Sequence, residues 1–443
     1  MSDTVQTPAL WRQLQAGATA LAAIRAGSSG TAALEAVPAG LRPGVQALVY
    51  AALRELGRAE ALRRQLAPRK PPPAVDALLC LALALAWRDE GAPYEAHTLV
   101  NQAVEAAKRT ESTRAQAGFV NACLRRFLRE RAALVAQTDA DPVAHWNHPR
   151  WWIERLQQDA PQHWQAILQA NNRPPPMTLR VNTRRATVAG VLSRLQAGGI
   201  DARRNGVSGL TLATPLPVQQ IPGFDEGLVS VQDAAAQLAA PLLLQGLAQQ
   251  PGLRVLDACA APGGKTAHLL EIAGEGVEVL ALDIAESRCR RIEDNLQRLG
   301  LQAEVRAADA GQPDRWWDGR LFDAILLDAP CTASGIVRRH PDVRWLRRES
   351  DVAQLAAEQA RLLQTLWPLL RPGGRLLYCT CSVFRAEGEE QVQAFLAHNS
   401  GARLLPSPGH LWPTLLPKAD AVTDNQVSDH DGFYYALLEK GAG

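Results

Sequence analysis

The stretch Leu253–Leu270, LRVLDACAAPGGKTAHLL, decides the fold of this chain. An apolar strand pattern ends in an acid, Asp257. Small residues then run from Ala258 to Gly264, and a helical pattern begins at Lys265. This order predicts a strand, a tight glycine turn and the start of a helix. Because such a turn lets the backbone approach a ligand and a helix start offers N–H groups, the stretch predicts a phosphate or nucleoside site.

A nucleoside triphosphatase is one alternative, since Gly264, Lys265 and Thr266 supply the second half of a phosphate-binding loop. The position of the first glycine of that loop is occupied by Cys259, and the dinucleotide fingerprint G-x-G-x-x-G is absent. We therefore favour a nucleoside site in a doubly wound sheet, where ligands lie beyond the carboxyl ends of the strands. Magnesium-dependent nucleotide hydrolysis would support the alternative.

Length and composition limit the class of protein. A chain of 443 residues is expected to form two or three domains, and 47% hydrophobic with 21% charged residues is typical of globular proteins. No apolar run is long enough to span a membrane; Leu78–Trp87 predicts a buried helix. The start, MSDTVQTPAL, lacks the pattern of a signal peptide. Seven irregularly spaced cysteines indicate a reduced, cytoplasmic protein with neither a disulfide framework nor a zinc site.

The net charge is only +2, but basic residues cluster. Residues 1–140 carry 17 Lys or Arg against 12 Asp or Glu, with a dense run at Arg125–Arg131, RRFLRER. Such a run is usually a solvated helix face, although an RNA-facing surface is the alternative. Residues 173–204 carry seven Arg and a single acid, Asp201. This charge predicts contact with a phosphate backbone.

Four parts follow from the pattern along the chain. Residues 1–140 are expected to be all-helical, residues 141–172 to form a tryptophan-rich helical connector, and residues 173–237 to form a small α+β unit. Strands and helices alternate in residues 238–443, which predicts a largely parallel sheet with helices on both faces. The expected strands are Arg254–Ala258, Val277–Asp283, Glu304–Ala308, Phe322–Leu327, Arg375–Tyr378 and Phe433–Leu438.

Three acids follow successive expected strands: Asp283, Asp309 and Asp328. A carboxylate after the second strand suits a ribose diol, because it can accept two O–H hydrogen bonds. A strand-end Asp is also a common helix cap. Three of them in order after a glycine turn favour a nucleoside site.

Two further stretches bring thiols to the same edge. Cys331 follows the strand that ends at Asp328, and Cys381 lies in Thr380-Cys381-Ser382, downstream of a turn at Arg371–Gly374. A lone cysteine is usually a small buried hydrophobe. Two at the ligand edge, each beside small polar residues, predict a nucleophile and a helper. Cys379 is expected within a strand, and the others are expected to be structural: Cys80, Cys123, Cys259 and Cys289.

Several strings resemble the RNA cytosine-5 methyltransferases of the Sun/Fmu type: DACAAPGGKT, LDAPCTASGIVRRHPD, YCTCSVFRAEGEEQV and DGFYYALL. HPRWW, NNRPPPMTLRVN and SVQDAAAQL resemble the connector and small RNA-binding subdomain of that family. The first 140 residues resemble the helical antitermination factor NusB, a domain carried by members that act on small-subunit (16S) ribosomal RNA. The resemblance covers nearly the whole chain. One departure is Thr332-Ala333-Ser334, where the family typically places serine first after the cysteine.

The resemblance implies a fold and an activity. The fold is multidomain α and α/β: a NusB-like all-α domain, a small α+β RNA-binding subdomain and a doubly wound, Rossmann-like class I methyltransferase sheet. The activity is methylation of carbon 5 of a specific cytidine in small-subunit ribosomal RNA, with S-adenosyl-L-methionine as methyl donor. We expect a monomer that binds ribosomal RNA and does not associate with membranes.

The resemblance also implies site residues. Asp283 would hold the ribose hydroxyls, Asp309 would lie near the adenine amino group, and Asp328 would lie near the methionine end and the target base. Cys381 resembles the nucleophile, and Cys331 resembles the second thiol needed for release. The cofactor loop would comprise Cys259, Ala260, Ala261, Pro262, Gly263, Gly264 and Lys265.

The chemistry accounts for this set. Carbon 5 of cytosine is a poor nucleophile, so a thiolate that adds at carbon 6 is expected to activate the ring. Asp328, if protonated, would donate to N3, and Lys265 would bond the base or lower a thiol pKa. Cys331 would remove the proton from carbon 5 so that the thiolate can leave. The base must be unstacked to enter the pocket.

Three alternatives remain open. DNA cytosine-5 methyltransferases use the cysteine of a Pro-Cys dipeptide as nucleophile, which here is Cys331, whereas the Thr-Cys motif favours Cys381. Transfer RNA or large-subunit ribosomal RNA is the nearest alternative substrate. A non-enzymatic RNA-binding assembly factor is disfavoured, because both thiols and all three acids are present.

Overall fold

The computed structural model describes residues 8–88, 91, 93–247, 252–413 and 429–441. The chain's first residues, MSDTVQT, on which the prediction about a signal peptide depends, lie outside the described residues. The chain divides into two compact units, each described by itself. The helical unit comprises Met1–Arg173 and Val337–Arg348; the sheet unit comprises Pro174–Ile336 and Glu349–Gly443. Among the described helices, none is both long and apolar enough to cross a membrane.

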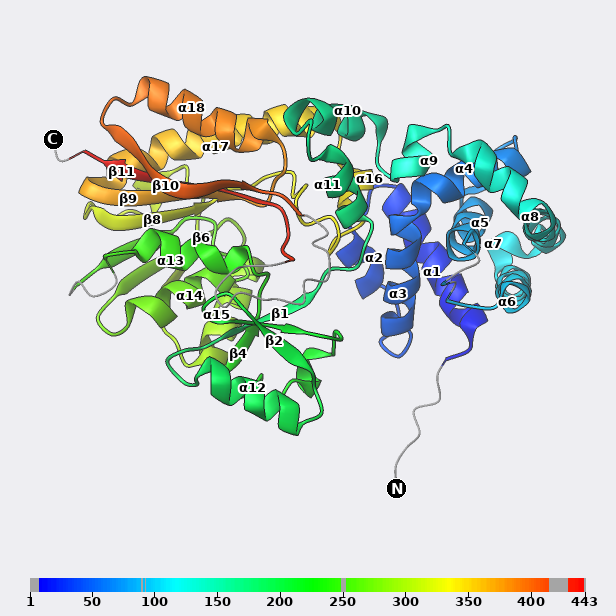
Figure 1. Cartoon of the computed structure of the whole chain (residues 1–443), viewed down its shortest axis with the longest axis horizontal. Coiled ribbons are helices and arrows are strands. Elements are labelled where there is room, and N and C mark those ends of the chain that lie inside the picture. Colours follow the sequence, from blue (N-terminus) through cyan, green and yellow to red (C-terminus); the bar gives the residue numbers. More distant parts are fainter. Residues whose placement is uncertain (1–7, 89–90, 92, 248–251, 414–428, 442–443) are drawn as a thin grey trace. The chain divides into compact units, whose positions relative to one another are not determined.

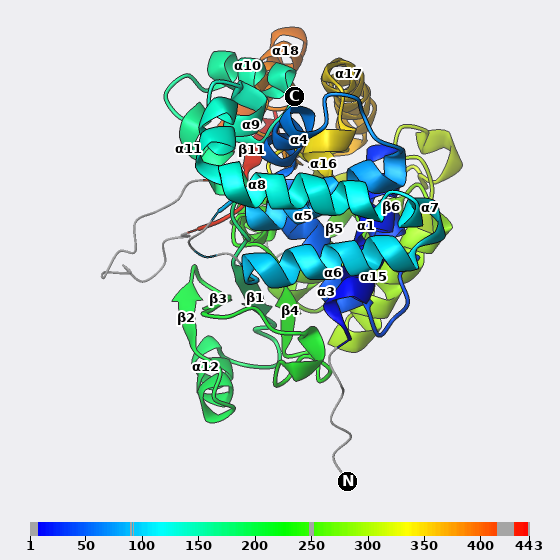
Figure 2. The same ribbon diagram turned by 90° about the vertical axis from the view of Figure 1, so that its right-hand side faces the viewer.

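The described part of the helical unit is built from helices. They are α1 (Leu10–Arg25), α2 (Gly30–Glu35), α3 (Arg42–Arg54), α4 (Leu56–Leu66), α5 (Pro73–Ala86), α6 (Ala96–Arg109), α7 (Glu111–Arg114), α8 (Ala117–Thr138), α9 (Pro142–Trp146), α10 (Arg150–Asp159), α11 (Trp164–Asn171) and α16 (Val343–Leu346). Helix α5 is apolar on all sides and buried from Val75 onward, which confirms the predicted buried helix. Helices α6 and α8 lie side by side (Figure 2).

The segment Val337–Arg348 belongs to the helical unit by packing, although its neighbours in sequence belong to the sheet unit. Asp342 accepts a hydrogen bond from the backbone N–H of Gly30 at 2.8 Å. The indole N–H of Trp345 donates to the carbonyl of Leu53 at 2.9 Å. The sequence pattern did not predict this placement. The downstream half of the chain therefore completes the helical core.

One sheet in the described part of the sheet unit has the strand order β10-β11-β9-β8-β5-β6-β7. Its strands are β5 (Arg254–Asp257), β6 (Glu278–Asp283), β7 (Glu304–Ala307), β8 (Phe322–Asp328), β9 (Leu370–Thr380), β10 (Ala402–Leu411) and β11 (Phe433–Lys440). Neighbouring strands from β5 to β9 pair in parallel, while β11 runs antiparallel to both β9 and β10. Strand order reverses between β5 and β8, the point at which doubly wound sheets bind ligands.

Helices cover both faces of this sheet, which confirms the predicted fold class. Helices α13 (Ala239–Leu244), α14 (Gly264–Ala273) and α15 (Glu286–Leu299) lie on one face; α17 (Glu349–Leu366) and α18 (Glu389–His398) lie on the other (Figure 1). In β8, Leu326 packs in the core beneath α13–α15 and the next residue, Leu327, packs beneath α17 and α18. Because both faces are buried, these strands appear in the sequence as continuous apolar runs.

Two elements differ from the sequence predictions. Strand β10 was not predicted, because it is a half-exposed edge strand that contains Pro406 and Pro408. The expected turn Arg371–Gly374 lies within β9, where the pairing with β8 shifts register between Phe322 and Ala324.

A smaller sheet of order β2-β3-β1-β4 lies in the same unit. It is formed by β1 (Met177–Val181), β2 (Ala202–Asn205), β3 (Gly209–Leu212) and β4 (Val229–Val231), with helix α12 (Val188–Ala197) packed on it. Strands and a helix are thus both present in the region expected to form a small α+β unit.

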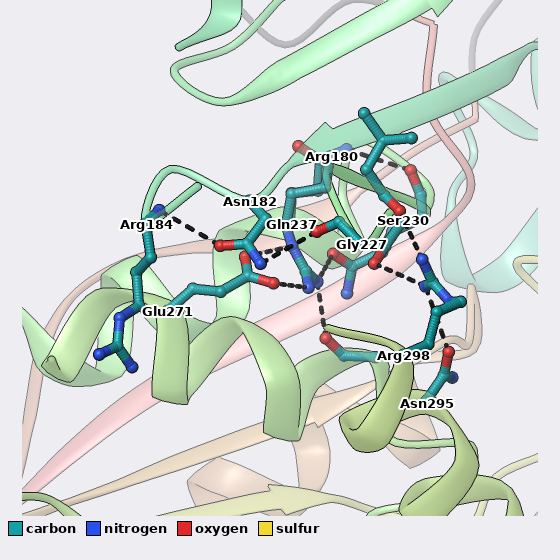
Figure 3. Close-up of polar contacts among 12 residues, drawn as sticks. Arg180, Asn182, Arg184, Gly227, Ser230, Gln237, Glu271, Asn295 and Arg298 are labelled. Carbon is teal, nitrogen blue, oxygen red and sulfur yellow. Dashed lines mark hydrogen bonds and ion pairs between the residues drawn. The ribbon is translucent and has the colours of Figure 1, made fainter. Parts of the chain in front are cut away.

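A buried arginine joins the small sheet to the large one (Figure 3). Arg180 of β1 donates to both carboxylate oxygens of Glu271 on α14, at 3.0 and 2.7 Å. Its third nitrogen donates to the carbonyl of Gly264 and to the side chain of Gln232, both at 2.6 Å. The side chains of Arg180 and Glu271 are 0% and 1% exposed. The small sheet is thereby fixed to the helix that follows the glycine turn.

Replacing Arg180 by Met should lower the stability of the sheet unit by about 3–5 kcal/mol, because it leaves a buried carboxylate unpaired. The double variant Arg180→Met with Glu271→Leu should recover most of that loss, since it removes both charges. Urea unfolding midpoints measure the effect. Arg194→Ala is the control, because Arg194 pairs with Glu226 on the exposed surface. Equal midpoints for Arg180→Met and Arg194→Ala would contradict the prediction.

Candidate active site

The glycine loop, residues 259–265, leads from β5 into α14 and passes close to α15. Gly263 has a φ of +92°, and a Cβ there would lie 3.0 Å from Cγ2 and 3.1 Å from Cα of Ile292. Glycine is therefore required both by backbone conformation and by the close approach of α15. Asn295 of α15 donates to the carbonyl of Pro262 at 3.0 Å, which further ties the loop to the helix.

A cavity of about 410 Å³ opens at the carboxyl ends of the parallel strands. Seven of the predicted site residues line it: Cys259, Ala261, Asp283, Asp309, Asp328, Cys331 and Cys381. The other predicted residues belong to the glycine loop and do not line the cavity: Ala260, Pro262, Gly263, Gly264 and Lys265. The cavity thus gathers the acids and thiols that the sequence placed at strand ends.

Asp283 closes one side of the cavity. Its carboxylate accepts a hydrogen bond from the backbone N–H of Ala261 at 3.1 Å and lies 3.2 Å from a guanidinium nitrogen of Arg288. The side chain is only 3% exposed. The acid that ends β6 is therefore bonded to the glycine loop, and it presents an anionic group to the cavity.

Asp309 lies at the next strand end. It accepts from the backbone N–H of Gly311 at 2.8 Å and from the side chain of Gln312 at 2.9 Å. Arg361 of α17 donates to it at 3.2 Å. Burial acts against the charge, but the hydrogen bonds from Gly311, Gln312 and Arg361 hold the pKa of Asp309 below its ordinary value.

Lys265 and Asp328 form an ion pair behind the thiols, with Nζ 2.6 Å from the carboxylate. The ammonium also lies 5.3 Å from the centre of the Phe433 ring. Burial opposes the charge of Lys265, yet the attraction of Asp328 raises the pKa of Lys265 above its ordinary value. Lys265 is thus held as an ammonium against Asp328, the residue that the sequence analysis expected to donate to the base.

The two thiols lie side by side, with 3.4 Å between the Sγ atoms of Cys331 and Cys381. Both follow neighbouring parallel strands in which Asp328 pairs with Cys379. The hydrogen bond with Cys381, together with burial, raises the pKa of Cys331 well above its ordinary value. Cys331 is thus a protonated thiol that can donate to Cys381.

Two other cysteines, Cys379 and Cys259, also lie close to the site. Cys379 lies within β9, as expected, but its thiol also donates to Asp328 at 3.4 Å. Cys259 lines the cavity, and burial raises its pKa. The described residues contain no cluster of three His, Cys, Asp or Glu side chains arranged to hold a metal ion.

Comparisons with known proteins show which family the chain belongs to. Residues 244–439 match the family model of the 16S rRNA methyltransferase RsmB/F. Residues 148–219 match the ferredoxin-like domain of RsmF/B-like methyltransferases, and residues 18–129 match the NusB family. The ribosomal RNA small subunit methyltransferase B of Vibrio cholerae serotype O1 is 42% identical over 94% of each chain. This chain belongs to that methyltransferase family.

Further relatives agree with this family. The protein of the same name from Pseudomonas syringae pv. tomato is 42% identical over 96% of each chain. The crystal structure of PH0851 has 26% identity and a TM-score of 0.75, and covers 96% of this chain and 99% of its own. A methyltransferase homologue from Pyrococcus horikoshii has 28% identity and a TM-score of 0.56 over 68% of this chain and 98% of its own. The RsmB/F family member described here is thus an rRNA methyltransferase with a NusB-like domain.

Three arginines at this site were not predicted from the sequence. Arg288 and Arg361 pair with the acids at the strand ends, and Arg180 holds the carbonyl of Gly264. The sequence did contain a signal for Arg288, because a basic residue early in a helix that follows an acidic strand end can pair with that acid. The sequence carried no comparable signal for Arg180, whose partners lie far along the chain.

Asp257 lies directly beneath the site and is fully buried. One of its oxygens accepts from the hydroxyl of Thr266 at 2.7 Å. Burial raises the pKa of Asp257 from 3.8 to about 7, although the Thr266 hydrogen bond opposes the shift. The folded protein therefore binds a proton here between about pH 4 and 7 that the unfolded chain releases, so this group's stability contribution falls as pH rises through that window.

Asp257→Asn should therefore become more stable relative to wild type as the pH increases. Between pH 5 and pH 8 the difference in unfolding free energy between variant and wild type should shift in the variant's favour by a few kcal/mol, since one pKa unit is worth about 1.4 kcal/mol. Urea unfolding at the two pH values measures it. Asp309→Asn is the control: a lowered pKa leaves Asp309 ionised across this range. A pH-independent difference for Asp257→Asn would refute the assignment.

Proposed function

We propose that this enzyme methylates carbon 5 of a specific cytidine in small-subunit ribosomal RNA, through a temporary bond between Cys381 and carbon 6 of the base. The observation that carries the proposal is the 3.4 Å separation of two thiols at the edge of a nucleoside-sized cavity. A methyl transfer to a ring nitrogen or to a ribose oxygen requires no thiol pair. The 42% identity to relatives named small subunit methyltransferases supports the choice of RNA.

The residues around the cavity fit S-adenosylmethionine. Asp283 supplies a carboxylate for a ribose diol, and the apolar side chains of Ile284 and Leu362 line the same space. Cys259 and Ala261 of the glycine loop line this space as well, so the loop backbone lies next to a bound ligand. When bound, S-adenosylmethionine supplies a methyl group on a sulfonium.

The two thiols divide the covalent chemistry between them. The Cys381 thiolate adds to carbon 6, so that electron density reaches carbon 5, which can then attack a methyl electrophile. Asp328 lines the cavity, and the ammonium of Lys265 paired with it lowers the energetic cost of negative charge on the pyrimidine ring. Carbon 5 then carries both its original proton and the new methyl group.

Release requires a base for that proton, and the thiol of Cys331 lies 3.4 Å from that of the nucleophile. Its hydrogen bond with Cys381 is the main factor that raises the pKa of Cys331 in the free enzyme. That hydrogen bond is weakened once the Cys381 sulfur is bonded to carbon 6. Ionisation of Cys331, with loss of its thiol proton to water, thus becomes easier at the stage when a base is needed. The Cys331 thiolate takes the proton, and the bond between Cys381 and carbon 6 breaks with its electron pair returning to sulfur.

The substrate is tested by bisulfite sequencing of ribosomal RNA from cells with and without the gene. One cytidine of small-subunit RNA should resist conversion only when the gene is present. Purified enzyme should restore that resistance only with S-adenosylmethionine, and Asp283→Ala should weaken cofactor binding. Loss of a signal in transfer RNA or large-subunit RNA instead would overturn the choice of substrate.

The roles of the thiols predict opposite behaviour of two variants. Cys381→Ala should abolish any covalent protein–RNA complex, because no sulfur is left to add to carbon 6. Cys331→Ala should accumulate the complex, because the carbon 5 proton then has no base. A denaturing gel with labelled RNA and S-adenosylmethionine separates the two outcomes, with Cys289→Ala, a buried thiol outside the cavity lining, as control. The reverse pattern would make Cys331 the nucleophile.

A further inference from the structure

Glu387 is a buried carboxylate that lies behind both thiols. It ends the short helical turn η5 (Arg385–Glu387) and is 0% exposed. One oxygen accepts from the backbone N–H of Thr332 at 2.8 Å and from the side chain of Gln359 at 3.2 Å. The other accepts from the hydroxyls of Thr332 and Ser382, at 2.5 and 2.6 Å. Four donors therefore converge on one carboxylate.

Two of these partners are the residues that directly follow the thiols. Thr332 follows Cys331, and Ser382 follows Cys381. The two loops are 50 residues apart in sequence, and a single side chain bonds to both. The position of Glu387 thus determines how the first residue beyond each thiol is held.

Additional hydrogen bonds join the same two loops. The hydroxyls of Ser334 and Ser382 lie 2.9 Å apart, and the backbone N–H of Val383 donates to Ser334 at 2.9 Å. The backbone N–H of Gly335 donates to the carbonyl of Cys381 at 2.9 Å. Ser382 belongs both to this set and to the set around Glu387, so the carboxylate orients the hydroxyl on which the cross-links depend.

We propose that Glu387 is a positioning residue for both thiols, which it holds close enough for the second thiol to act on the adduct formed by the first. This inference rests on the proposed function. It assigns to Glu387 a role in a step that the thiols alone do not explain: Cys331 removes the carbon 5 proton while carbon 6 is still bonded to Cys381, without movement of either loop. This proton transfer requires that both thiol loops be held rigidly by satisfied hydrogen bonds.

The electrostatic setting agrees with this geometry. Burial raises the pKa of Glu387, while its hydrogen bonds from Ser382 and Thr332 act in the opposite direction. After the hydrogen bond with Cys381 and burial, the charge of Glu387 also contributes to the raised pKa of Cys331. Glu387 therefore favours the protonated form of Cys331 before the nucleophile reacts.

The test compares Glu387→Ala with Glu387→Gln in a single-turnover reaction on a denaturing gel. Glu387→Ala should form the covalent complex but resolve it on the order of 10-fold more slowly or worse, since a small misplacement of a reacting group is costly. Glu387→Gln should resolve it within a few fold of wild type, because its amide keeps one acceptor oxygen and its N–H groups can donate to the two hydroxyls. Glu390→Ala, on the exposed face of α18, is the matched control.

A second measurement reports on the thiols without RNA. Phenylarsine oxide condenses with two neighbouring thiols, forming two As–S bonds and releasing one water. Wild type and Glu390→Ala should bind it tightly, Cys331→Ala should not, and Glu387→Ala should bind it at least about 10-fold more weakly. Thr332→Val removes one hydroxyl without creating a cavity, and it should weaken phenylarsine oxide binding in the same direction by a smaller factor. If Glu387→Ala does not fold, Thr332→Val replaces it in this test.

The outcomes separate the two proposals. If Cys331→Ala accumulates no complex, the proposed roles of the thiols fail, whatever Glu387→Ala does. If Cys331→Ala accumulates it and Glu387→Ala matches Glu390→Ala in both complex decay and arsenical binding, the inference about Glu387 is overturned. A parallel loss of complex formation and methylation in Glu387→Ala, with normal decay, would indicate only a smaller folded fraction and would also overturn it.

Discussion

Parallel pairing of β8 with β9 is the interaction on which the site depends. The two strands are in register at Asp328 and Cys379, so the loops that leave them begin side by side at one edge of the sheet. Cys331 lies three residues after Asp328, and Cys381 lies two residues after Cys379. A one-residue slip would send the following side chains to the opposite face and separate the thiols. Hydrogen bonds between main chains therefore set the distance between two reacting groups.

The sequence predicted the residues whose position follows from local pattern. Asp283, Asp309 and Asp328 end strands, and in a parallel sheet strand ends converge on one edge, so periodicity alone brought them together. Gly263 was predicted within a turn because small residues separate a strand pattern from a helix pattern, and the structure adds the reason, its close approach to Ile292. The fold class was predicted for the same reason: continuous apolar runs alternate with amphipathic ones.

Residues whose role depends on distant partners were not predicted. Arg180 and Glu271 are 91 positions apart, and Glu387 and Thr332 are 55 apart. A buried ion pair leaves no period in a sequence, and an acid in a polar run such as RAEGEE is expected on the surface. Strand β10 was missed because its prolines and half-exposed residues resemble a loop. The residues that line the site can thus be predicted from the sequence, whereas the buried residues that hold them in place depend on tertiary packing.

The placement of Val337–Arg348 has a consequence for how the protein is made. Arg344 is completely buried in the helical unit, where it donates to the carbonyls of Asn147 and Asn171. While the chain is being synthesised, the helices up to α11 emerge long before this arginine does. The helical unit therefore cannot form its contacts with Val337–Arg348 until much of the sheet unit has been translated, and a fragment ending at residue 173 would expose the surface that α16 covers.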